Sequence, residues 1–132
     1  ARKDFHYNET EELFYQLKGD IEVTVQTDGK AVKIPIKEGE MFLLPAKTPH
    51  SPVRPENSIG LVIERVRKGT NYTDGLMWFC DKCNHKLYEE RFILNDIVND
   101  FLEVFRRFYN SEENRTCEIC NHVMETDPKF TN

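Results

Sequence analysis

The sequence predicts an all-β fold of the barrel or jelly-roll type, followed by a C-terminal helix and a small four-cysteine metal knuckle. Short alternating segments with turn residues between them fill the first half. Apolar residues then recur at helical spacing after residue 92, and two C-x-x-C pairs complete the pattern. We therefore expect a barrel in residues 1–75 and a C-terminal segment, packed on the barrel, in residues 76–132.

Composition limits the classes of partner. The chain has 132 residues, a hydrophobic fraction of 39% and a net charge of −5, which fits one globular domain with a small appended module. Acidic and basic residues are mixed and form no basic stripe, so we expect no nucleic-acid partner. No apolar run reaches the length of a membrane span, so we expect no membrane association.

Strands are predicted where polar and apolar residues alternate, or where a short apolar run lies between turn signals. An apolar run at 13–18 ends at a Gly-Asp turn, and Asp28-Gly29 is a hairpin signal. Prolines at 45, 49, 52 and 55 predict a loop, because proline lacks a backbone donor. The expected strands are 21–26, 31–36, 41–44 and 59–65.

An amphipathic helix is predicted over about residues 92–109. Its apolar positions recur every three or four residues, as expected for one face of a helix. We expect this aromatic face to pack onto the barrel. The residues concerned are Ile93, Ile97, Val98, Phe101, Leu102, Phe105 and Phe108.

A first candidate metal site combines His6, Glu12 and His50. Two histidines and one carboxylate are the ligand set of non-haem Fe(II) oxygenases, which leaves positions open on the metal. His6 and Glu12 bracket the entry to one strand, and His50 follows another. In a small barrel, inward side chains from such strands can meet on one metal ion.

A second candidate metal site is formed by Cys80, Cys83, Cys117 and Cys120. Two C-x-x-C pairs separated by 33 residues indicate a closed tetrathiolate site with a structural role, and either zinc or iron suits it. Each pair continues as Asn-His, and asparagine tolerates the left-handed backbone that a knuckle needs there. Paired thiols of this kind are typical of a reducing compartment, so we expect a cytoplasmic protein.

The spacing of several residues resembles the cupin superfamily. Glu12 is followed seven residues later by Gly19, as in the first cupin motif. Gly39, Pro45 and His50 follow the spacing of the second motif. Three positions depart from the usual pattern: Asn8 replaces a second histidine, and Lys47 and Arg54 replace a glycine and an asparagine.

These departures resemble one cupin family, the 3-hydroxyanthranilate 3,4-dioxygenases. The likeness extends from Arg2 to Cys120. Members carry a further N-terminal segment, so we expect the chain to lack the first part of the barrel. The stretches that carry the likeness are Arg2 to His6, Phe14 to Leu17, Phe42 to Pro45, His50 to Arg54 and Val62 to Arg65.

The resemblance implies Fe(II) at His6, Glu12 and His50, with the substrate bound beside Glu12. The product implied from 3-hydroxyanthranilate and O2 is 2-amino-3-carboxymuconate semialdehyde, on the kynurenine route to quinolinate and NAD. Members are homodimers, and those of bacteria and fungi carry the four-cysteine site.

Three further residues receive catalytic roles from the resemblance. Arg54 would pair with the substrate carboxylate, which suits its planar fork. Glu64 would accept a hydrogen bond from the substrate amine, and Arg2 would lie beside dioxygen. Two other readings remain open: a non-catalytic metal-binding cupin that binds a small molecule, and a zinc ribbon that binds nucleic acid, against which the net acidity weighs.

Overall fold

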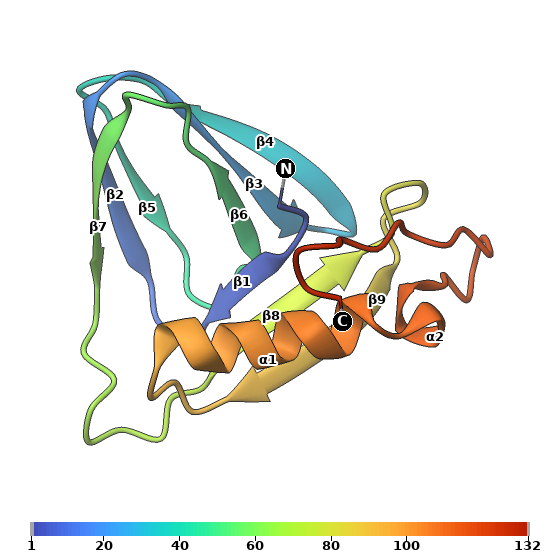
Figure 1. The fold of residues 1–132 in the computed structure, drawn as a ribbon. Helices are drawn as coiled ribbons and strands as arrows, with labels where there is room; N and C mark the ends of the chain where they lie inside the picture. The colour runs from blue at the N-terminus through green and yellow to red at the C-terminus, as the bar shows by residue number, and fades with distance from the viewer. Residues whose placement is uncertain (1, 132) are drawn as a thin grey trace. The chain divides into compact units, whose positions relative to one another are not determined.

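The computed structural model describes residues 2–131 and contains strands β1 to β9 followed by two helices (Figure 1). The chain divides into two compact units. One unit holds residues 6–72, and the other holds the residues up to Phe5 together with those from Thr73 onward. The predicted all-β class with a C-terminal helix is confirmed.

The 6–72 unit contains two antiparallel sheets. One has the strand order β4-β3-β6-β1, and the other has the order β5-β2-β7. Apolar side chains from both sheets form one core, which consists of Phe14, Ile21, Val23, Val25, Ile36 and Leu44. The strands are β1 (Phe5–Asn8), β2 (Glu12–Lys18), β3 (Ile21–Thr27), β4 (Lys30–Ile36), β5 (Met41–Leu44), β6 (His50–Val53) and β7 (Ile59–Glu64).

Local sequence explains the hairpin between β3 and β4. Burial alternates along β3, because Ile21, Val23 and Val25 point into the core. Asp28 and Gly29 both have positive φ, of 52° and 75°. Two consecutive residues of this kind make the turn that matches the twist of a hairpin. The predicted strands and the predicted turn are confirmed here.

The loop predicted from the four prolines is wrong over part of its length. Residues His50–Val53 form β6, and Pro52 lies opposite Val23 of β3. The backbone N–H of Gln26 donates to the carbonyl of Pro49 at 2.9 Å. Hydrogen-bonded pairs alternate along an antiparallel ladder, so Pro52 occupies a position whose missing N–H takes no part in pairing with β3.

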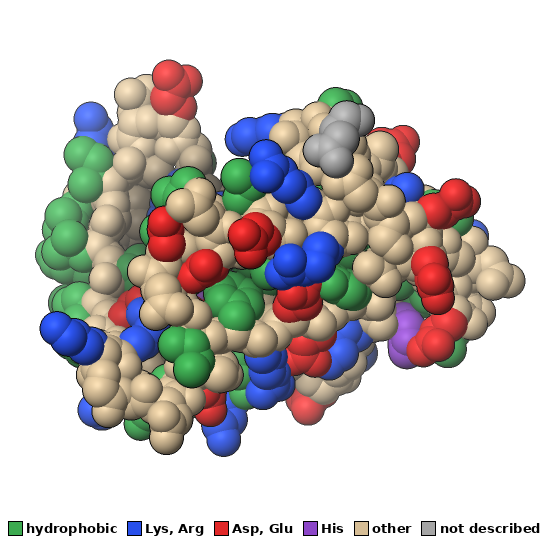
Figure 2. All heavy atoms as spheres, turned by 60° about the horizontal axis from the view of Figure 1, so that its bottom comes forward, with side chains coloured by type: hydrophobic (Ala, Val, Ile, Leu, Met, Phe, Trp, Pro, Cys, Tyr) green, Lys and Arg blue, Asp and Glu red, His purple; other side chains and the backbone are tan. Residues whose placement is uncertain are grey.

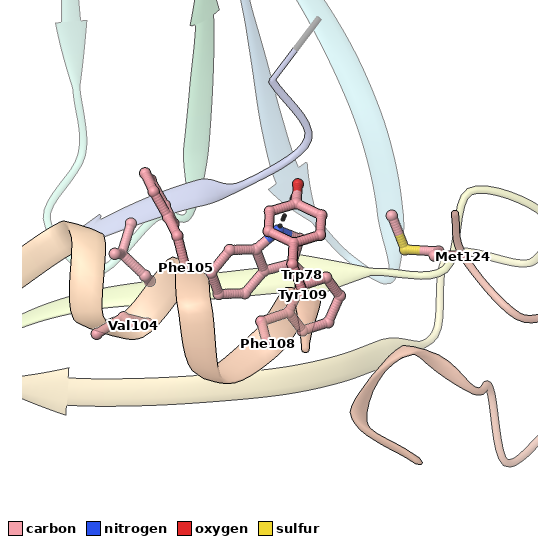
Figure 3. Close-up of a cluster of buried hydrophobic side chains, with 7 residues drawn as sticks. Trp78, Val104, Phe105, Phe108, Tyr109 and Met124 are labelled. Atoms are coloured by element: carbon pink, nitrogen blue, oxygen red, sulfur yellow. Dashed lines mark hydrogen bonds between the residues drawn. The ribbon is translucent and has the colours of Figure 1, made fainter. Parts of the chain in front are cut away.

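The other unit is built on a hairpin and a helix. Strands β8 (Asp74–Phe79) and β9 (Lys86–Phe92) pair antiparallel, and α1 (Ile97–Tyr109) packs on them through its aromatic face. Figure 3 shows this core, in which Trp78 stacks on Phe108 with ring centroids 4.2 Å apart. The indole Nε1–H also donates to the hydroxyl of Tyr109 at 3.4 Å. A short helix, α2 (Glu112–Arg115), follows.

The helix begins later than the sequence predicts. Residues up to Phe92 belong to β9, a strand that the sequence reading missed, and Asp96 caps α1 by accepting from the N–H groups of Val98 and Asn99. Ile97 lies outside the buried face and is 60% exposed. The two helices of the described residues have 13 and 4 residues, too short to cross a bilayer.

Candidate metal centres

The structure brings His6, Glu12 and His50 together inside the 6–72 unit. His6 of β1 lies opposite His50 of β6, and Glu12 is the first residue of β2 in the other sheet. One ligand atom from each residue lies within 4.8 Å of the others. Two imidazoles and one carboxylate so close together form a donor set suited to a first-row transition metal.

His50 is held with one ring nitrogen directed at Glu12. Its Nδ1 lies 3.0 Å from the carbonyl of Thr48, and a carbonyl can only accept. Nδ1 therefore carries a proton, so Nε2, which lies 3.3 Å from Glu12 Oε2, is the nitrogen available to bind a metal ion. Both side chains are nearly fully buried. A histidine fixed through its outer nitrogen is the usual arrangement of a metal ligand.

Asn8, which replaces a second histidine of the cupin motif, contacts the carboxylate. Its Nδ2 donates to Glu12 Oε1 at 3.2 Å. Its own Oδ1 accepts from the backbone N–H and the hydroxyl of Thr10, each at 3.3 Å. Asn8 therefore orients Glu12, a role that the sequence reading did not assign.

The neighbouring side chains favour an ionised Glu12. In the metal-free protein burial by itself raises the pKa of this carboxyl, but a proton on His50 Nε2, through its hydrogen bond and charge, and the hydrogen bond from Asn8 lower it to about 2. An anionic carboxylate beside an imidazole nitrogen that can exchange its proton for a metal ion attracts a cation.

Glu64 ends β7 directly opposite Glu12 in the strand register. Burial, and then the charge of Glu12, raises the pKa of Glu64. Arg67 Nη1 donates to Glu64 Oε2 at 3.1 Å and partly offsets both effects. The sequence reading missed Arg67, because Glu64 ends a strand and a charge pair three residues apart is a signal only on a helix. Arg54 follows the last residue of β6 and is exposed.

Arg2 belongs to the other unit. Its guanidinium forms a two-pronged ion pair with the buried carboxylate of Asp4, at 2.9 and 2.5 Å. The same guanidinium lies over the ring of Phe105, 5.3 Å from its centroid. The hydrogen bond with Asp4 raises the pKa of Arg2, so this side chain is held firmly as a cation.

The four cysteines of the second site converge. Cys80 Sγ and Cys120 Sγ lie 3.7 Å apart, Cys83 Sγ and Cys117 Sγ lie 3.5 Å apart, and all four sulfurs lie within 4.8 Å of one another. A tetrahedral site with metal–sulfur bonds of about 2.3 Å has sulfur–sulfur edges of roughly 3.8 Å. The donor set thus fits a four-thiolate metal.

Both C-x-x-C pairs have the predicted knuckle backbone. Asn84 and Asn121 have positive φ, of 66° and 63°. Their N–H groups donate back to the carbonyls of Cys80 and Cys117. The N–H of Cys120 points at Cys117 Sγ and lowers the pKa of that thiol to about 6. At Cys83 the backbone N–H of His85 is outweighed by burial and the neighbouring thiols, which raise the pKa of Cys83 to about 12. A proton is therefore lost first from Cys117, and the thiolate is the form that binds metal.

Comparison with known proteins identifies one enzyme family. A family profile described as 3-hydroxyanthranilic acid dioxygenase matches residues 1–109. A 3-hydroxyanthranilate 3,4-dioxygenase of Xanthomonas euvesicatoria pv. vesicatoria is 55% identical over 130 residues, covering 98% of this chain and 73% of the relative. A protein of the same name from Bacillus thuringiensis is 44% identical over 124 residues, covering 93% and 69%.

Proposed function

Because the chain belongs to the 3-hydroxyanthranilic acid dioxygenase family, we propose that it opens the ring of 3-hydroxyanthranilate with O2. The product is 2-amino-3-carboxymuconate semialdehyde, which leads to quinolinate and NAD. The observation that carries this proposal is the convergence of His6, Glu12 and His50.

The metal we propose at these three residues is Fe(II), because their donor set fits it. When bound, ferrous iron with three protein ligands offers open positions to both an aminophenol and dioxygen. The protein supplies one negative charge at Glu12, and His50 is oriented by the Thr48 carbonyl. Burial of Glu12 and His50 limits the access of water to this side of the site.

Substrate recognition is assigned to Arg54 and Glu64. A guanidinium can bind the substrate carboxylate through two parallel hydrogen bonds. Glu64, held by Arg67 beside Glu12, can accept from the substrate amine. We expect Arg54→Lys to raise KM more than it lowers kcat, because lysine lacks the planar fork. The role of Arg2 beside dioxygen stays a prediction, to be tested by the oxygen dependence of Arg2→Ala.

Oxygen uptake tests the proposal. The protein is loaded with Fe(II) under anaerobic conditions and mixed with 3-hydroxyanthranilate and O2, and ring opening is followed by absorbance. Glu12→Gln should lower the rate more than about a hundredfold, beyond the usual effect of an outer-shell partner. The matched control is Glu11→Gln, an exposed neighbour that should retain the wild-type rate. A folded, iron-loaded wild type with no uptake would favour a non-catalytic binding cupin.

The four cysteines are proposed to hold a structural zinc or iron. Four thiolates fill a tetrahedron and leave no position for substrate. The thiolates must remain reduced to bind metal, which supports a cytoplasmic location.

We also propose a homodimer, formed through the outer face of the β5-β2-β7 sheet. Leu43 and Ile63 both lie opposite Leu13 in the register, and they are 54% and 57% exposed. Met41 and Leu61 form the next row, at 63% and 49% exposure. Hydrophobic side chains gather at the left edge of Figure 2, beside interspersed acidic and basic groups. Rows of apolar side chains on one face are typical of an interface.

The dimer is tested by sedimentation at micromolar concentration. Leu43→Glu should shift the wild-type dimer towards monomer, because it places a charge in the apolar row. Val66→Glu is the control, since Val66 is 77% exposed in the segment after β7. A monomeric wild type would contradict the proposal.

A further inference from the structure

The two cysteine knuckles are built alike over eight residues each. Phe79 pairs with Lys86 at the ends of the first, and Thr116 pairs with Val123 at the ends of the second. Within each, the N–H of the first cysteine donates to the carbonyl of the trailing histidine at 2.8 Å. His85 and His122 are therefore fixed by the main chain, each to its own knuckle.

The side chains of these histidines reach the opposite knuckle. His85 Nε2 lies 2.9 Å from Glu118 Oε1, and His122 Nε2 lies 2.7 Å from Asp81 Oδ1. A carboxylate only accepts, so the ring nitrogens donate. Glu118 and Asp81 each follow the first cysteine of their knuckle. We call these two reciprocal contacts the histidine bridges.

We propose that the histidine bridges position the two knuckles and thereby set how firmly the four-thiolate site retains its metal. The inference rests on the proposed metal site. The ligands come from two segments 33 residues apart, so metal release requires the knuckles to separate. The bridges span the same gap as the metal and oppose that separation.

Both histidines act as positioning residues and not as ligands. Their Nε2 atoms are engaged with carboxylates, and the clustered donor atoms are the four sulfurs. Partners of this kind outside the ligand shell orient a metal site and typically change its affinity by about 10- to 100-fold.

The two bridges are unequal. Asp81 also accepts from Lys3 Nζ at 2.6 Å, and its side chain is 38% exposed. Glu118 is 79% exposed, so its ion pair with His85 is weakened by water. We therefore expect the His122–Asp81 bridge to contribute more to metal retention than the His85–Glu118 bridge.

Cobalt release tests the proposal. The full chain is loaded with Co(II), whose thiolate charge-transfer absorption reports the cysteine site alone, and the decay of that band is followed after excess EDTA is added. The double variant His85→Ala/His122→Ala should start with the wild-type band and lose it roughly tenfold faster. This factor is the low end of the range for residues that hold a metal ligand in place, because the bridges are partly exposed. His122→Ala should account for most of the change.

Conservative variants separate positioning from a general loss of packing. His122→Gln should retain slow release, because the glutamine amide can donate from a similar place. Asp81→Ala and Glu118→Ala should each accelerate release, and Asp81→Ala should have the larger effect. Glu113→Ala, at an exposed carboxylate of α2 outside both bridges, should release cobalt like the wild type.

Three results would overturn the inference. Release from the double variant within twofold of the wild type would show that the bridges do not retain the metal. A changed starting band in the single histidine variants would make a histidine a ligand. A wild type without any cobalt–thiolate band would remove the metal site itself, while leaving ring-opening activity to be judged separately by oxygen uptake.

Discussion

Asn8→Ala should weaken iron binding about tenfold while the chain stays folded. The change removes the hydrogen bond from Nδ2 to Glu12 Oε1, at 3.2 Å between two buried side chains. A hydrogen bond to a charged group contributes about 1.5–3 kcal/mol, and the long distance here indicates the lower value. About 1.4 kcal/mol corresponds to a factor of ten in affinity. This agrees with the range for outer-shell partners of metal ligands.

Anaerobic titration calorimetry with Fe(II) measures this effect directly. Thr10→Val is the matched control, because the backbone N–H of Thr10 still donates to Asn8 Oδ1 after its hydroxyl is lost. The control should bind iron within twofold of the wild type. Wild-type affinity in Asn8→Ala would refute the orienting role. An equal loss of iron affinity in Thr10→Val would instead show that the effect comes from the conformation of the loop between β1 and β2.

Three further predictions concern Glu12, Cys117 and Phe108. In the metal-free protein, the pKa of Glu12 is about 2 against an ordinary 4.5, so its stabilising contribution is present above pH 4.5 and is lost as the pH falls towards 2. Wild-type stability in urea should therefore fall by about 2 kcal/mol between pH 6 and pH 3 through this group, and Glu12→Gln should lack that part of the pH dependence. Cys117→Ser should increase proteolysis of the C-terminal residues but leave oxygen uptake measurable, and complete loss of uptake in a protein whose 6–72 unit is still folded would contradict this separation of roles. Phe108→Ala should cost about 3–5 kcal/mol in chemical denaturation, because the ring is fully buried against an indole, and a cost below 1 kcal/mol would show that the core can collapse around the gap.

Local sequence was a good guide where a pattern depends on neighbours in the chain. Alternation predicted β3 and β4, and Asp28-Gly29 predicted the hairpin between them. The same reasoning failed for β6, because proline is compatible with a strand when its nitrogen lies at a non-pairing position. That position depends on the register with β3, which the residues around Pro52 do not reveal.

The position at which α1 begins also depends on more than the local spacing of apolar residues. Apolar residues from position 93 onward fit a helical face, yet β9 continues to Phe92 and Asp96 provides the cap. Pairing with β8 competes with the helix for the preceding residues. An N-cap signal at Asp96 was present in the sequence and would have corrected the boundary.

The sequence by itself determined the chemistry available to this protein. Two histidines and a carboxylate of the type that binds iron in oxygenases can be found from the sequence. So can two cysteine knuckles with asparagine at the left-handed position. These inferences succeed because ligand type and knuckle backbone are properties of short segments.

Only the tertiary structure decided which groups support those ligands. Asn8 donates to Glu12, Arg67 holds Glu64, and His85 and His122 reach acidic residues across a gap of more than thirty positions. Such contacts depend on strand register and side-chain direction, and neither follows from spacing along the chain.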